Sequence, residues 1–205
     1  MLTAQILTGY TYATEAAPTG KEWESPENLA LNKEQPHAWF FPFQNVEAAR
    51  GVLPAGSTYW QSLDGDWHFH WSPDPASRPA DFYRPGYDVS AWDLIPVPSS
   101  WNIYGIRKDG TLKYGTPIYV NQPVIFQHKV AVDDWRGGVM RTPPTNWTTY
   151  KVRNEVGSFR RDFTLPASWD GREVFVNFDG VDSFFYLWIN GHYVGFSKNS
   201  RNVAS

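Results

Sequence analysis

Residues 184–196, FFYLWINGHYVGF, contain the pattern that decides the fold. Asn190 and Gly191 both tolerate a positive φ angle, so this pair predicts a type I′ turn between two antiparallel strands. Successive residues of 184–189 are expected to face opposite sides of the first strand. The chain from 192 to 196 is expected to return beside it, which makes the stretch a β-hairpin rich in aromatic residues.

Other parts of the chain also favour strands. In 62–71, SLDGDWHFHW, aromatic and polar residues alternate, which predicts a half-buried strand. Residues 94–101, LIPVPSSW, are restricted to an edge strand or an extended segment, because proline cannot donate to a ladder. Further strands are expected in 156–165 and 174–178, whereas VEAAR at 46–50 predicts one short helical turn. Short strands separated by turn signals predict an all-β sandwich or barrel.

Composition narrows the class of protein. The 205 residues have a formal net charge of −3, which argues against nucleic acid as the main partner because such a role leaves a basic footprint. No run of eighteen apolar residues occurs, so no membrane-spanning segment is predicted. The absence of cysteine excludes disulfides and thiolate metal sites, but it fits both a bacterial periplasm and the cytoplasm.

The chain is expected to have three parts. Residues 1–27 carry little pattern and are predicted to be a poorly ordered leader without the basic start of a signal peptide. Residues 28–58 are predicted to form an extended arm, since prolines among its aromatic residues block a regular helix. Residues 59–205 are predicted to be the β domain, with a long irregular stretch from 103 to 156.

Local motifs for catalysis are weak. His68 and His70 share the polar face of one strand, but a metal site needs three or four ligands. Asp133 and Asp134 are adjacent and would point to opposite sides of an extended chain, which makes them a poor acid/base pair. Aromatic residues on predicted loops could instead stack on the C–H face of a sugar, and the candidates are Trp101, Tyr104, Tyr114, Tyr119 and Phe196.

Five stretches of the chain carry a resemblance to a known family. They are LDGDWHF, VPSSW, YGTPIYVN, GSFRRDF and VFVNFDGVDSFFYLWINGHYVGFSKNSR. In order and spacing, residues 28–205 resemble the amino-terminal domain of glycoside hydrolase family 2 β-galactosidases. The resemblance implies a galactose-binding-domain-like jelly roll, expected to be incomplete at its carboxyl end, with further strands, an immunoglobulin-like domain and a catalytic barrel absent from the sequence.

The resemblance also implies which residues contact substrate. In the family, the loop at VPSSW and the loop at SKNSR reach the active-site mouth, which assigns substrate contacts to Ser100 and Asn199, with Trp101 shaping the first loop. Ser100 replaces a common asparagine and has fewer hydrogen-bonding atoms. Asn199 replaces a common aspartate near a sodium ion, so the sodium site and strict galactose preference are weakened. Sodium and magnesium are expected only in the full enzyme.

The resulting hypothesis is the amino-terminal domain of a retaining β-galactosidase, a homo-oligomer that acts on terminal β-galactosides. No catalytic residue is assigned to this chain, which is expected to be inactive alone. Two alternatives stay open: a stand-alone carbohydrate-binding module, and the same domain in a β-glucuronidase or β-mannosidase. A role in subunit assembly is a third reading, and it concerns the arm at 28–45.

Overall fold

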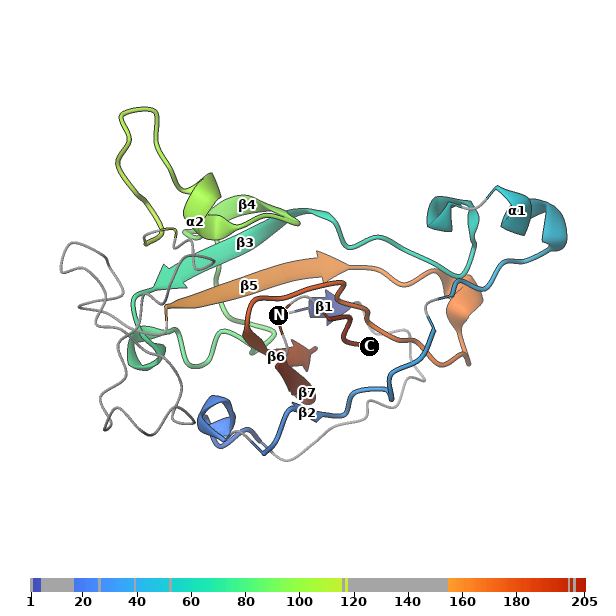
Figure 1. The fold of residues 1–205 in the computed structure, drawn as a ribbon, viewed down its shortest axis with the longest axis horizontal. Helices are drawn as coiled ribbons and strands as arrows, with labels where there is room; N and C mark the ends of the chain where they lie inside the picture. Colours follow the sequence, from blue (N-terminus) through green and yellow to red (C-terminus); the bar gives the residue numbers. More distant parts are fainter. Residues whose placement is uncertain are drawn as a thin grey trace, which may run out of the picture. The chain divides into compact units, whose positions relative to one another are not determined.

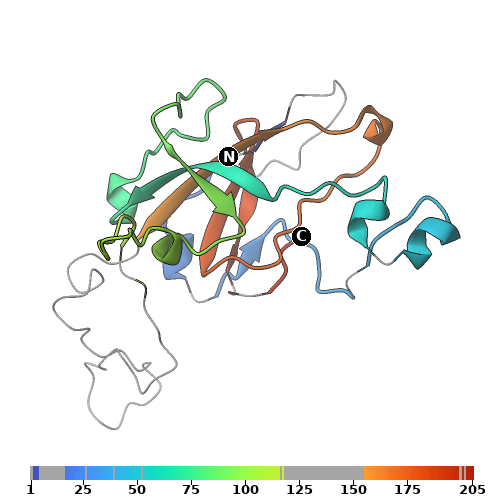
Figure 2. The ribbon, with the colours of Figure 1, turned by 90° about the horizontal axis from the view of Figure 1, so that it is seen from above.

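A computed structural model describes most of the chain, with gaps. The described residues are 2–4, 17–25, 27–38, 40–51, 53–115, 117, 155–198, 200 and 202–205. Strands predominate over short helices in them, and most strand pairs are antiparallel, so the fold is all-β as predicted (Figures 1 and 2). No helix among these residues has the length and apolar character needed to cross a membrane. The chain forms two compact units, and each is described by itself: the first is 1–64, 81–88 and 160–205, the second 65–80 and 89–159.

The first unit is built around the predicted hairpin. β6 (Phe184–Ile189) pairs antiparallel with β7 (His192–Lys198), and Asn190 and Gly191 between them have φ angles of 51° and 84°. The type I′ prediction is therefore confirmed in both positive φ values. β1 (Leu2–Ala4) pairs parallel with β6 and with β5 (Val156–Phe163).

Part of the predicted arm is paired with the hairpin. β2 (Ala30–Leu31) lies antiparallel to β7, and the Lys198 backbone N–H donates to the Leu29 carbonyl at 2.8 Å. The Asn32 side chain donates to the Val194 carbonyl at 3.0 Å. Gly195 makes this approach feasible, because a Cβ atom there would lie 2.2 Å from the Leu31 carbonyl oxygen. The division into leader, arm and domain stays a prediction.

The strand predicted at 174–178 is wrong. Alternation is present, since Val174, Val176 and Phe178 are partly buried while Phe175 is 53% exposed. Only Phe178 forms a β-bridge, however, through its two backbone hydrogen bonds with Ala204 at 2.8 and 2.9 Å. Alternation gives a segment two faces, but a strand also needs a neighbouring chain along its length, and that requirement is non-local.

The first unit also contains short helical elements. The predicted helical turn is confirmed as α1 (Val46–Arg50), which begins after Asn45, whose side chain accepts from the Ala48 N–H at 2.8 Å. Three 3₁₀ turns complete this unit's helical structure in the described residues: η1 (Glu22–Glu24), η2 (Pro54–Gly56) and η5 (Ala167–Trp169). The Trp169 indole N–H donates to the Thr58 carbonyl at 2.8 Å, so η5 holds the end of the arm.

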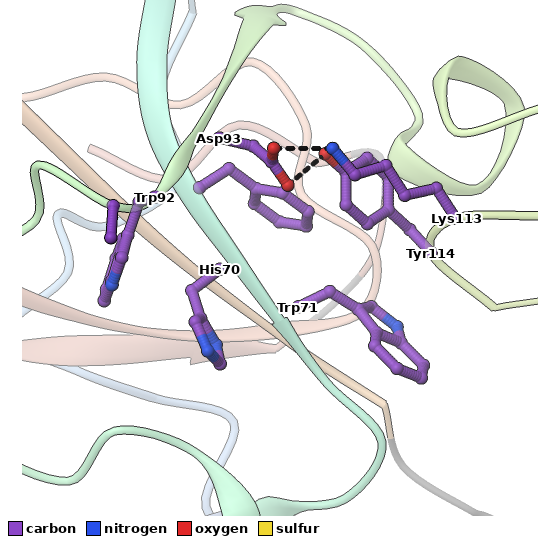
Figure 3. A pocket seen from close by; sticks show the side chains of 8 residues that line it. His70, Trp71, Trp92, Asp93, Lys113 and Tyr114 are labelled. Atoms are coloured by element: carbon purple, nitrogen blue, oxygen red, sulfur yellow. Dashed lines mark hydrogen bonds and ion pairs between the residues drawn. The ribbon is translucent and has the colours of Figure 1, made fainter.

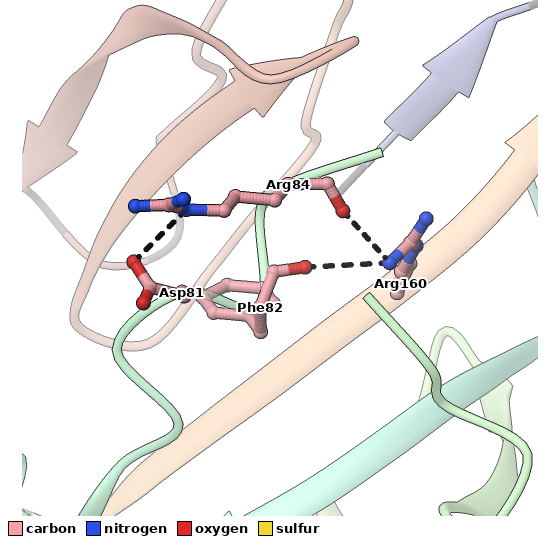
Figure 4. A network of polar contacts seen from close by, with 4 residues as sticks. All are labelled: Asp81, Phe82, Arg84 and Arg160. Carbon is pink, nitrogen blue, oxygen red and sulfur yellow. Dashed lines mark hydrogen bonds and ion pairs between the residues drawn. The ribbon is translucent and has the colours of Figure 1, made fainter. Parts of the chain in front are cut away.

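A buried arginine fixes one loop of the first unit. Arg160 on β5 is 6% exposed, and Figure 4 shows its guanidinium beside the backbone of the loop 81–88. Its Nη1 atom donates to the carbonyls of Tyr87 at 2.8 Å and Arg84 at 3.2 Å, and its Nη2 atom donates to the Pro85 carbonyl at 2.7 Å. A guanidinium satisfies several carbonyls at once because its five donors lie in one plane.

The second unit contains the other predicted antiparallel pair. β3 (Gly65–Ser72) pairs with β4 (Asp93–Val97), with Trp67 opposite Ile95 and Phe69 opposite Asp93. β4 ends the strand order and β3 lies between it and β5, which confirms the edge position predicted from its prolines. The unit also contains η3 (Pro75–Ser77) and α2 (Trp101–Tyr104).

Aromatic residues form the core of the second unit. Phe69 is fully buried, and its ring centroid lies 4.8 Å from that of Phe159, 5.0 Å from Tyr114 and 5.7 Å from Trp101. Gly157 leaves space for these rings, since a Cβ atom there would approach Trp101 at 2.7 Å and Phe69 at 2.8 Å. The core therefore fixes the end of β3 against the start of α2.

Candidate functional site

The loop before α2 presents the first candidate, Ser100. Ser100 is exposed and is the residue before the helix, and its backbone carbonyl accepts from the N–H groups of Ile103 at 3.1 Å and Tyr104 at 2.9 Å. Its side chain caps no N–H of α2. The first turn of the helix therefore holds the backbone of Ser100 in place. The Ser100 hydroxyl takes no part in capping the helix.

Trp101 anchors the same loop. It is partly buried, and its ring lies 5.7 Å from Phe69 and 6.1 Å from Phe159. Its indole nitrogen is buried without a hydrogen-bond partner among the described residues. Trp101 therefore packs against the aromatic core of this unit, and its role in the loop stays a prediction.

A half-buried carboxylate, Glu155, lies behind this loop. Its Oε2 atom accepts from the Asn102 amide at 3.4 Å and from the Trp71 indole N–H at 3.5 Å. The Asn102 amide also donates to the Tyr114 carbonyl at 3.1 Å, so Glu155 joins α2 to β3 and to residue 114. Sequence reasoning missed Glu155, because a single glutamate before a strand carries no periodic or motif signal.

Glu155 is expected to make the stability of the chain depend on pH. Burial raises the pKa of its carboxyl above the ordinary value of 4.5, although hydrogen bonds from Trp71 and Asn102 act in the opposite direction. A raised pKa means that the folded chain binds this proton more tightly than the unfolded chain. The stabilising effect of protonation is full below the unfolded pKa and is lost as pH rises through the folded pKa.

We predict that Glu155→Gln removes this dependence. The melting temperature of the variant relative to the parent should rise by about 2 °C between pH 4 and pH 8, a small change because solvent partly screens the site. Thermal unfolding followed by circular dichroism at several pH values measures it. Glu34→Gln, at an exposed position, is the matched control and should show no such trend. A difference that stays constant with pH would contradict the prediction.

The other candidates have mixed outcomes. Tyr114 and Phe196 are 4% and 6% exposed, so neither presents an open ring face on which a sugar could stack. Tyr104 is 50% exposed and remains a candidate. Three further sets lie outside the described residues and have no structural test: Asn199, Tyr119 and the pair Asp133–Asp134.

The two histidines of β3, His68 and His70, are part of no cluster of metal-ligating side chains among the described residues. The His70 Nδ1 atom lies 3.3 Å from the Ser72 hydroxyl, and the His70 ring lies 5.3 Å from that of Trp92. Among the residues that the structure describes, no group of three or more His, Asp or Glu side chains is placed to hold a metal ion. Hydrogen bonding and ring packing therefore account for His70.

Comparison with known proteins identifies the class. Residues 60–205 match the family described as glycosyl hydrolases family 2, sugar binding domain. The chain is 35% identical over 201 residues to the β-galactosidase of Priestia megaterium, covering 97% of this chain and 18% of that protein. It is 32% identical over 176 residues to the β-galactosidase of Halalkalibacterium halodurans, covering 86% of this chain and 15% of the relative. The match to the β-galactosidase large subunit of Leuconostoc lactis is 28% over 189 residues, covering 87% and 27%.

The family follows from these matches. The fold is all-β, and the family match covers more than half of the chain. The chain belongs to the sugar-binding domain family of the family 2 glycosyl hydrolases. It spans only 15–27% of the length of the three relatives named above.

Proposed function

We propose that this chain is the amino-terminal jelly-roll domain of a β-galactosidase that hydrolyses terminal β-galactosides with retention of configuration. The relatives named β-galactosidase support the substrate class, and the matched family supports sugar binding. The structural observation that carries the proposal concerns Ser100, which is exposed. Its hydroxyl caps no helix N–H, while its backbone is held in place by α2.

In this proposal Ser100 donates to or accepts from a hydroxyl of the galactosyl group. Trp101 holds the loop through its packing on Phe69, and Asn199 contributes from the second loop. A weak sodium site at Asn199, magnesium elsewhere and assembly into a homo-oligomer belong to the same proposal for the longer protein. Both catalytic carboxylates are placed outside this chain, which is expected to hydrolyse no aryl β-galactoside alone.

Inhibition by galactose in the full-length parent protein tests the Ser100 contact. We predict that Ser100→Ala raises the inhibition constant about fivefold, because one hydrogen bond contributes about 1 kcal/mol. Ser100→Asn should lower the constant, since an amide offers additional donors. Steady-state kinetics with an aryl β-galactoside measures both variants.

Ser99→Ala is the matched control for this experiment. The Ser99 hydroxyl is engaged within the loop, where it donates to the Pro96 carbonyl at 2.5 Å. A change of galactose inhibition in the Ser100 variants but not in the Ser99 variant supports a direct contact. An unchanged constant in both Ser100 variants would overturn the assignment of this loop to the substrate site.

A further inference from the structure

The second unit has a surface pocket that is separate from the Ser100 hydroxyl. It has a volume of about 240 Å³ and opens where β3 continues beyond the first residue of β4. Phe69 is the last residue of β3 that pairs with β4, and it lies opposite Asp93. Beyond Phe69, β3 no longer pairs with β4. The side chains labelled in Figure 3 line this opening: His70, Trp71, Trp92, Asp93, Lys113 and Tyr114.

Fixed polar groups lie at one end of the pocket. The Asp93 carboxylate accepts from the Lys113 ammonium at 2.5 Å and from the Tyr114 hydroxyl at 2.6 Å (Figure 3). Burial alone would raise the pKa of Asp93, but the hydrogen bonds from Lys113 and Tyr114 hold it below its ordinary value of 3.8. Asp93 is therefore ionised at neutral pH, and its charge is balanced by Lys113.

This pair retains hydrogen-bonding capacity. A carboxylate accepts about four hydrogen bonds, and an ammonium carries three donors. The side chains of Asp93 and Lys113 are 41% and 40% exposed, so water or a ligand reaches them. Together they place a fixed acceptor next to a fixed donor without a net charge, an arrangement suited to neighbouring hydroxyl groups and not to an ion.

Aromatic surface completes the pocket. Trp71 and Trp92 are only partly buried, in contrast to Phe69, which is fully buried in the core. Figure 3 shows Trp92 beside His70 on one side of β3 and Trp71 on the other. Indole rings offer an apolar face with a polar edge, which suits the C–H face of a pyranose ring.

We propose that this pocket is a second carbohydrate-binding site, which takes a single neutral hexose unit. Pockets for drug-sized ligands measure about 300–1,000 Å³, and a volume of about 240 Å³ is large enough for one sugar ring. Asp93 and Lys113 bind vicinal hydroxyls, and the Trp92 indole, on one side of β3, contacts the ring carbons. The site is independent of the Ser100 loop and of catalysis.

Titration of the full chain with galactose and with glucose tests this site. Isothermal calorimetry and ligand-observed NMR measure the affinity, with glycerol as a non-cyclic polyol. Asp93→Asn keeps the shape of the side chain but removes its charge, and we expect it to weaken binding about tenfold, because a hydrogen bond to a charged group contributes about 1.5–3 kcal/mol. Trp92→Ala should weaken binding to a similar extent.

A carboxylate in the other unit provides the matched control for the pocket variants. Asp81→Asn removes the carboxylate of the exposed Asp81–Arg84 ion pair and should bind hexose as the parent does. Circular dichroism confirms folding, and Asp93→Asn remains informative if Trp92→Ala fails to fold. If Ser100→Ala abolished hexose binding while the pocket variants preserved it, the proposal would be overturned. Absence of saturable hexose binding, or equal binding of glycerol, would also overturn it.

Discussion

Phe69→Ala is expected to lower the free energy of unfolding of the chain by about 4 kcal/mol, the range observed for large buried aromatic residues. Phe69 has no exposed surface, and its ring contacts those of Trp101, Tyr114 and Phe159. Truncation leaves a cavity among rigid rings, which cannot collapse easily around it. Since α2 begins at Trp101, the same change should loosen the loop that carries Ser100.

Urea unfolding followed by tryptophan fluorescence and circular dichroism measures this loss. Phe40→Ala is the matched control, because Phe40 is 72% exposed and its truncation should change stability by less than about 0.5 kcal/mol. The rate of amide hydrogen exchange at residues 101–104 measures how far the loop that carries Ser100 is loosened. A loss below about 1 kcal/mol for Phe69→Ala would contradict the central position of this ring in the core.

Arg160→Met is expected to destabilise the chain by about 3 kcal/mol, because hydrogen bonds that involve a charged group contribute about 1.5–3 kcal/mol each and are not additive. The carbonyls of Arg84, Pro85 and Tyr87 would lose their guanidinium donors. Methionine fills much of the volume but donates no hydrogen bond. The loop 81–88 should therefore exchange its amide hydrogens faster in the variant.

Arg84→Met provides the control for this prediction. Arg84 pairs with Asp81 at 3.2 Å on the surface, where the two side chains are 66% and 58% exposed, and such pairs contribute less than about 1 kcal/mol. Arg160→Lys should recover only part of the stability, since an ammonium cannot reach as many carbonyls as a planar guanidinium. Equal losses for Arg84→Met and Arg160→Met would contradict a special role for Arg160.

Local rules predicted much of the fold correctly. The Asn190–Gly191 turn, the alternating strand that became β3 and the proline-restricted edge strand that became β4 all follow from the chemistry of a few neighbouring residues. The turn α1 follows in the same way. Each of these features is set by a short stretch of chain, so the sequence pattern contains it.

Features that depend on distant parts of the chain were not predictable in this way. β1 pairs with β5 and β6, although Leu2 and Arg161 are far apart in the sequence. The segment 174–178 has strand-like alternation but no partner along its length.

The positions of individual side chains also depend on distant parts of the chain. Glu155 contacts Asn102 and Trp71 only because folding brings these residues together. Burial of Tyr114 and Phe196 likewise depends on packing, whereas the exposure of Ser100 agrees with a loop position.

The close approach of β2 to Gly195 has a consequence for solubility. β2 ends the strand order and covers the outer side of β7, where Leu29 and Asn32 occupy backbone groups of Lys198 and Val194. An uncovered strand edge is a template for pairing with another chain. Residues 29–32 therefore prevent other chains from pairing with this edge of β7. A shortened protein that starts after them would expose this edge and be prone to self-association.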